Sequence, residues 1–131
     1  MNYIRAVISE IQSVDGITIV SFQAEGQELK MMALELDNSI QIGNKVVLGA
    51  KATNTSLAKE LKGLLSVSNQ LPCRIESVEF GELLCSVKLG FLGEILESII
   101  TKDSAIRMNL QVEDEVLALI KSSELSIVEV L

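Results

Sequence analysis

EVLALIKSSELSIVEVL, residues 115–131, alternates apolar and polar side chains almost throughout, which is the pattern of a half-buried β-strand. The alternation is interrupted by Lys121, Ser122 and Ser123, and a second strand-like run follows. We therefore expect two strands, at 114–121 and 123–130, that meet where one cation and two hydroxyl groups come together. This stretch decides the fold because an earlier part of the chain repeats it.

The chain contains two copies of one small β unit. KVVLGAKAT (45–53) aligns with EVLALIKSS (115–123), and NYIRAVISEI (2–11) aligns with NQLPCRIESV (69–78). The offset between the copies grows from 67 to 70 residues, so the second copy gains three residues between about 100 and 110. The repeat predicts two domains, a first unit at 1–65 with a linker and a second unit at 66–131.

Each copy is predicted to hold five short strands, and the fold class is therefore all-β. Asp15-Gly16, Glu25-Gly26 and Gly93 supply turn chemistry between the strand-like runs. Five strands in about 60 residues can close into a small barrel, which removes exposed sheet edges. The expected strands lie at 3–11, 16–23, 28–36, 44–51 and about 53–58 in the first copy, and at 71–79, 83–89, 94–101, 114–121 and 123–130 in the second.

Two short helices are expected outside the strands. SLAKELKGLL (56–65) has apolar residues at helical spacing, with Thr55 or Ser56 as the N-cap. Gly63 costs such a helix about 1 kcal/mol, so we predict only a short linker helix between the two barrels. KDSAIRMNL (102–110) is predicted to form a short helix or turn that caps the second barrel.

The composition excludes several classes of protein. The chain has no histidine, and the spacing of Cys73 and Cys85 matches no zinc motif, so we expect two reduced, packed thiols and no metal-cation site. The absence of histidine also excludes Ser-His and Cys-His nucleophiles. No phosphate-cradling glycine loop is present. We therefore expect a protein that is not an enzyme.

The charge is negative and unevenly distributed. The net charge is −7, of which residues 1–65 contribute −1 and residues 66–131 contribute −6. With no basic cluster and only 3% aromatic residues, direct nucleic-acid binding is disfavoured. No apolar run reaches the roughly 18 to 20 residues of a membrane-spanning helix, and the start lacks the apolar block of a signal peptide. We expect a soluble cytoplasmic protein without a membrane partner.

Three stretches of the second copy, in order, resemble the molbindin (Mop, or TOBE-type) family, whose units have an oligobinding-like (OB-like) fold. SVSNQL (66–71) resembles the family's opening Ser-Ala-Arg-Asn segment, IITKDS (99–104) its Ile-Thr-x-x-Ser element, and ALIKSS (118–123) its closing Lys-Ala/Ser-Ser. The tandem layout resembles the molybdate-binding half of molybdate-responsive regulators and is similar to stand-alone tandem molbindins. The resemblance implies two tandem OB-like (Mop/TOBE) barrels.

The resemblance also implies a ligand and an assembly. Such proteins bind molybdate or tungstate as an oxyanion, without an organic cofactor, where two units meet. This implies a homo-oligomer, a dimer or a trimer, with sites at the interfaces between units. The implied oxyanion-binding residues are Ser66, Ser68, Asn69, Thr101, Ser104, Lys121, Ser122 and Ser123 in the second copy, and Asn2, Lys51, Ala52 and Thr53 in the first.

The sequence departs from the family pattern in three places. Ser68 stands where the family has arginine, and the first copy begins at Met1-Asn2, with no residue for that place. The first copy also has LELDNS (34–39) in place of the Ile-Thr-x-x-Ser element. No residues are left over for a DNA-binding region, so a regulatory role implies a separate DNA-binding or transporter partner.

The chemistry of the implied residues fits a proton-free tetrahedral dianion. Molybdate has four acceptor oxygens, and hydroxyl, ammonium, amide and backbone N–H groups are donors. Taken singly, however, Lys121 can be a strand-end lysine, Ser122, Ser123 and Asn69 can be turn residues, and Thr101 and Ser104 can cap a helix. The function expected is molybdate or tungstate binding for storage, homeostasis or sensing. The alternative is a dimerisation or partner-docking module whose oxyanion site has decayed.

Overall fold

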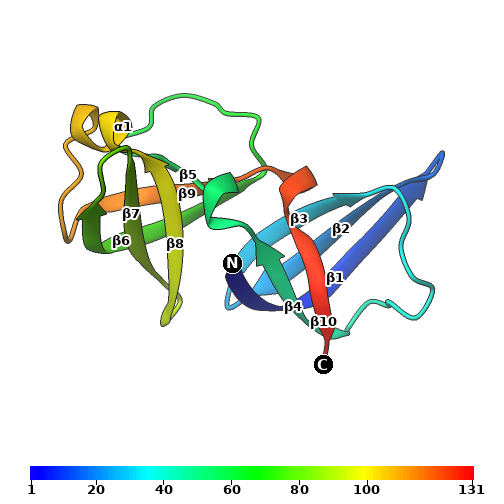
Figure 1. The fold of residues 1–131 in the computed structure, drawn as a ribbon. Coiled ribbons are helices and arrows are strands. Elements are labelled where there is room, and N and C mark those ends of the chain that lie inside the picture. Colours follow the sequence, from blue (N-terminus) through cyan, green and yellow to red (C-terminus); the bar gives the residue numbers. More distant parts are fainter.

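The chain folds into two five-stranded antiparallel sheets with OB-like topology, and the computed structural model describes all residues from 1 to 131 (Figure 1). The first half contains β1 (Asn2–Val14), β2 (Ile17–Ala24), β3 (Gln27–Ala33), β4 (Lys45–Ala50), a 3₁₀ turn η1 (Ala52–Asn54) and β5 (Ser56–Ala58). The second half contains β6 (Asn69–Phe80), β7 (Leu84–Phe91), β8 (Glu94–Thr101), α1 (Lys102–Arg107), β9 (Glu115–Ile120), a 3₁₀ turn η2 (Ser122–Glu124) and β10 (Ser126–Val130). The prediction of an all-β chain with two tandem five-stranded units is confirmed.

The internal repeat predicted from the sequence is visible in the strand register. The long first strand of each half carries a β-bulge at the same place, between Ile8 and Glu10 in β1 and between Ile75 and Ser77 in β6. These positions differ by the predicted 67 residues. A bulge bends its strand and increases the local twist, and here it lets one strand serve both sides of a small barrel.

The last strand of each half pairs with the sheet of the other half. β5 pairs antiparallel with β9, so that Leu57 lies opposite Ala118. β10 pairs antiparallel with β4, so that Ile127 lies opposite Leu48. The strand orders are β10-β4-β1-β2-β3 and β5-β9-β6-β7-β8. The expectation that 53–58 and 123–130 close the barrels of their own copies was therefore wrong.

The linker helix predicted at 56–65 does not form. Its first residues belong to β5, where pairing with β9 satisfies the backbone, and the chain is irregular from 59 to 68. Glu60 and Gly63 have φ values of 57° and 91°, which lie in the left-handed region and interrupt a right-handed helix. Leu64 is fully exposed. The apolar spacing of this segment therefore does not mark a buried helical face.

The other local predictions hold. Residues 102–107 form the short helix α1, as expected for KDSAIRMNL. The β1–β2 hairpin turns at Asp15-Gly16, and the β7–β8 hairpin turns at Leu92-Gly93, each with two positive φ values. Such turns match the twist of the flanking strands and favour glycine at the second position.

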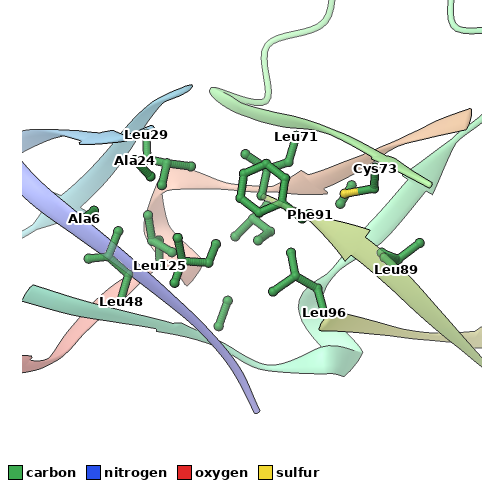
Figure 2. Packing of buried hydrophobic residues seen from close by; sticks show 14 of the residues in the cluster. Ala6, Ala24, Leu29, Leu48, Leu71, Cys73, Leu89, Phe91, Leu96 and Leu125 are labelled. Carbon is green, nitrogen blue, oxygen red and sulfur yellow. The ribbon is translucent and has the colours of Figure 1, made fainter. Parts of the chain in front are cut away.

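The buried side chains of both halves form one continuous core. The cluster contains 25 buried residues, and Figure 2 shows it running from Leu29 and Leu48 in the first half to Leu89 and Leu96 in the second. Leu125, which directly precedes β10, is buried in this cluster. The exchange of strands therefore places each half's chain within the other half's packing. No helix in the structure has the length and apolar character needed to cross a membrane.

Candidate functional site

The two lysine–hydroxyl segments form equivalent turns where the chain crosses from one half to the other. Lys51 lies between β4 and η1, and Lys121 lies between β9 and η2, both in extended backbone conformation. The carbonyl of Lys51 accepts the N–H of Asn54 at 3.0 Å, and that of Lys121 accepts the N–H of Glu124 at 2.9 Å. These turns are therefore part of the strand exchange, which answers why a charge and two hydroxyls stand between two strands.

Most donors of these turns are free. Lys51 and Lys121 are exposed, and neither ammonium has a carboxylate within 4 Å. Thr53 and Ser123 are exposed and Ser122 is half-buried, and their hydroxyls bond no other protein group. Ala52 is buried and has no polar side chain. Two ammonium groups and three hydroxyls are thus available to an anion.

A pocket of about 220 Å³ lies between the two turns. Lys51 and Asn54 of the first copy line it together with Ser123 and Glu124 of the second copy. Asn54 Nδ2 donates a hydrogen bond of 2.8 Å to Glu124 Oε2 across this pocket. The rest of the lining comes from Met1, Gly49, Ala50, Leu125 and Ser126. The structure therefore brings predicted residues of both copies, Lys51 and Ser123, to one cavity.

The predicted asparagines are occupied by contacts between the halves. Asn69 is completely buried, and its side-chain amide exchanges two hydrogen bonds with the backbone of Lys30, at 2.8 and 2.9 Å. Asn2 is 4% exposed and pairs in the same way with the backbone of Glu97, at 2.7 and 2.8 Å. Asn2 also donates to Thr55 Oγ1 at 3.1 Å. The structure uses both amides to hold the two halves together.

Thr101 and Ser104 act as caps of α1. The Ser104 N–H donates to Thr101 Oγ1 at 3.1 Å, and the Thr101 hydroxyl donates to Ser104 Oγ at 2.9 Å. Arg107 also donates to Ser104 Oγ, at 3.2 Å. Thr101 lies opposite Leu84 at the β6–β7 hairpin end of the sheet. Lys121 follows the residue that lies opposite Asn69, at the other end of β6, so one chain does not bring Thr101 and Lys121 together.

Ser66 and Ser68 are exposed and lie in the irregular segment that leads into β6. Ser68 is the repeat counterpart of Met1, and Met1 lines the pocket between the turns. The two serines therefore enter the second barrel beside the start of β6, with their side chains open to solvent or to another copy of the chain.

A negative charge lies beside the start of the chain. The Glu97 carboxylate accepts the Ser86 hydroxyl and lies 3.2 Å from Lys88 Nζ. The Ser86 hydrogen bond, more than the lysine, lowers the pKa of Glu97 below its ordinary value. Glu97 is therefore ionised at neutral pH, but Lys88 largely balances its charge.

Sequence reasoning missed Asn54 and Glu124. The repeat alignment contained the signal, because residues 54 and 124 differ by the 70-residue offset. Counterparts that touch each other lie near the pseudo-twofold axis relating the halves. The largest cavity, about 520 Å³, is elsewhere, on the second half beside Pro72, Arg74 and Leu117, and contains none of the predicted residues.

Comparisons with known proteins agree with this architecture. The sequence model of the TOBE domain family matches residues 65–127. Among solved structures, the crystal structure of the cytoplasmic molybdate-binding protein ModG with molybdate bound is similar over nearly the whole chain. The TM-score is 0.90 at 24% sequence identity, covering 96% of this chain and 94% of that one. No curated protein sequence matches.

Proposed function

Because residues 65–127 form a TOBE domain, we propose that this chain is a cytoplasmic binding protein for the tetrahedral oxyanions molybdate and tungstate, which it stores, buffers or senses. The observation that carries the proposal is the pair of lysine–hydroxyl turns, with Lys51 and Lys121 exposed and free of ion pairs. The similarity to a molybdate-bound protein along both halves supports it. The protein acts by binding, not by catalysis.

The chemistry of the turns favours an anion that only accepts hydrogen bonds. Ammonium and hydroxyl groups donate to every oxygen of a proton-free dianion. A charge-assisted hydrogen bond contributes about 1.5 to 3 kcal/mol, so about four of them support micromolar binding after the cost of association. Thr53, Ser122 and Ser123 supply hydroxyls next to the two lysines.

A complete site also needs donors that one chain does not bring to its turns. The exposed Ser66 and Ser68 belong to the second barrel, and Thr101 lies at the far end of β6. We place the sites where the turns of one copy meet another copy, in a homodimer or homotrimer. Exposed apolar side chains of β1 and β10, among them Tyr3 and Val128, offer surface for such contacts.

Calorimetric titration with molybdate, tungstate and sulfate tests the proposal. Molybdate and tungstate are expected to bind at micromolar concentration or below, and sulfate more weakly because it is smaller. Lys121→Ala and Lys51→Ala remove one ammonium each and are expected to weaken binding by about tenfold or more. Lys62→Ala is the matched control, because Lys62 is an exposed lysine of the linker without an ion pair. Equal affinity for all three anions, or none, contradicts the proposal.

A second function is favoured by the occupied donors. Asn2 and Asn69 bond backbone within the chain, and Ser68 replaces the family arginine. These features fit an oxyanion-independent dimerisation or partner-docking module, acting with a separate DNA-binding or transporter protein. Light scattering with and without molybdate separates the two. An oligomer that Lys121→Ala disrupts, without any anion binding in the wild type, identifies the docking module.

A further inference from the structure

The contact between Asn54 and Glu124 joins two residues that occupy the same place in the two copies. They are 70 residues apart, the offset of this part of the repeat. Each is the last residue of its 3₁₀ turn, and Asn54 Nδ2 donates to Glu124 Oε2 at 2.8 Å. A neutral amide in one copy thus faces a carboxylate in the other, and both line the pocket between the turns.

The Glu124 carboxylate is not balanced by a cation. No lysine or arginine nitrogen lies within 4 Å of it, and Asn54 supplies its one hydrogen bond. Lys51 lines the same pocket of about 220 Å³, also without an ion pair. The pocket therefore presents the donors of Lys51 and Ser123 together with one strong acceptor.

We propose that Glu124 sets the anion selectivity of the pocket between the two turns, excluding proton-free tetrahedral dianions and accepting protonated ones such as hydrogen phosphate. This inference rests on the proposed oxyanion-binding function and adds a pocket with different selectivity. Molybdate and sulfate have no proton to donate to Glu124, and they compete with it for Asn54 Nδ2. Hydrogen phosphate donates its proton to the carboxylate while its other oxygens accept from Lys51 and Ser123.

The magnitude of the effect follows from the charges. A carboxylate within one pocket of a dianion repels it through a medium with an effective dielectric constant of about 20 or more, little screened at that range. A hydrogen bond to a charged acceptor offsets this repulsion only for a ligand that carries a proton. The repulsion remains in full for molybdate.

Glu124→Gln tests the inference, because glutamine keeps the acceptor oxygen for Asn54 and removes the charge. The ratio of molybdate affinity to phosphate affinity, measured calorimetrically at fixed ionic strength, is expected to rise by about tenfold or more over wild type. Asn54→Ala is the matched control, since it breaks the same hydrogen bond and leaves the carboxylate. It is expected to leave that ratio within about threefold of the wild-type value.

The outcomes separate the inference from the proposed function. A wild type that binds molybdate, with an unchanged ratio in Glu124→Gln, overturns the inference alone. An equal change in Asn54→Ala and Glu124→Gln also overturns it, because the broken bond and not the charge is then responsible. If neither protein binds any anion, the proposed function fails as well. Circular dichroism spectra establish that both variants are folded.

Discussion

Asn2 and Asn69 make the same contact in opposite directions: each is the first residue of a long strand, and each pairs its side-chain amide with the backbone of the other half. The partners, Glu97 and Lys30, are also repeat counterparts, 67 residues apart. The two amides act as paired clamps about the pseudo-twofold axis. A polar side chain buried this deeply is tolerated because its donor and its acceptor are both satisfied.

Removal of either clamp should destabilise the fold. Asn69→Ala leaves the Lys30 N–H and carbonyl without their partner, and we expect a loss of about 1 to 3 kcal/mol in the free energy of unfolding. Urea denaturation followed by circular dichroism measures it. Asn38→Ala is the matched control, because Asn38 is exposed and makes no side-chain hydrogen bond. A loss in Asn69→Ala no larger than that of the control would contradict the clamp.

Deletion of residues 126–131 should expose the sheet of the first half. β10 pairs with β4, so amides of β4 are expected to lose hydrogen-exchange protection while those of β9 keep it. Leu57→Pro is the mirror control, because it disrupts β5 and should expose β9 instead. If the deletion exposed β9 and spared β4, each half would carry its own last strand.

Gly49 allows β10 to lie close against β4. A Cβ atom at this position would lie 2.6 Å from Val128 Cγ1 and 3.3 Å from Met1 Cε. Gly49→Ala is therefore expected to cost about 1 to 3 kcal/mol through overpacking. The double variant Gly49→Ala/Val128→Ala should recover most of that loss, since the shorter side chain removes the closest contact. Thermal and urea unfolding of the two single variants and the double variant give the coupling between the positions; strictly additive losses would rule out the contact.

Lys59 fastens the exchanged strand β5 to the second half. Its Nζ lies 2.9 Å from Asp114 Oδ2 and donates to the carbonyl oxygens of Asn109 and Met108 at 2.9 and 3.3 Å. The Lys59 hydrogen bond, together with the Gln111 N–H, lowers the pKa of Asp114. A lowered folded-state pKa means that the stabilisation is present above the unfolded value of about 3.9 and is lost as pH falls through the folded value.

Asp114→Asn should therefore destabilise the protein at pH 7 and less so in acid. The difference between the melting temperatures of wild type and variant is expected to shrink as pH is lowered from 5 towards 3. Asp103→Asn serves as the control, since Asp103 is an exposed carboxylate without an ion pair. A difference that stays constant over this range would argue against the ion pair as its cause.

The two thiols should be unreactive in the folded protein. Burial raises the pKa of Cys73 to about 11 and also raises that of Cys85. Because the thiolate is the reactive form, we expect slow labelling by a thiol reagent at pH 8 and complete labelling of both in urea. Rapid labelling of Cys73 under native conditions would show that the core opens locally beside β6.

The sequence alone determined the repeated β unit, most strand positions, the hairpin turns and the two lysine–hydroxyl turns. Alternation along a strand and the glycine in a tight turn are local signals, so they can be read without knowing what packs against them. The predicted linker helix failed for the same reason. The spacing of Leu57 and Leu61 fits a helix, but pairing of Ser56–Ala58 with β9 overrode that local preference.

Only the tertiary structure decided which barrel each last strand completes. The two copies offer nearly equivalent sheet edges, and a strand with the same alternation can pair with either, so no local pattern distinguishes the choices. The exchange then decided which polar groups remain available. It buried Asn2 and Asn69 between the halves, left Lys51 and Lys121 free, and brought Asn54 against Glu124. Hydrogen-bond partners of side chains more than 50 residues apart depend on how the whole chain packs.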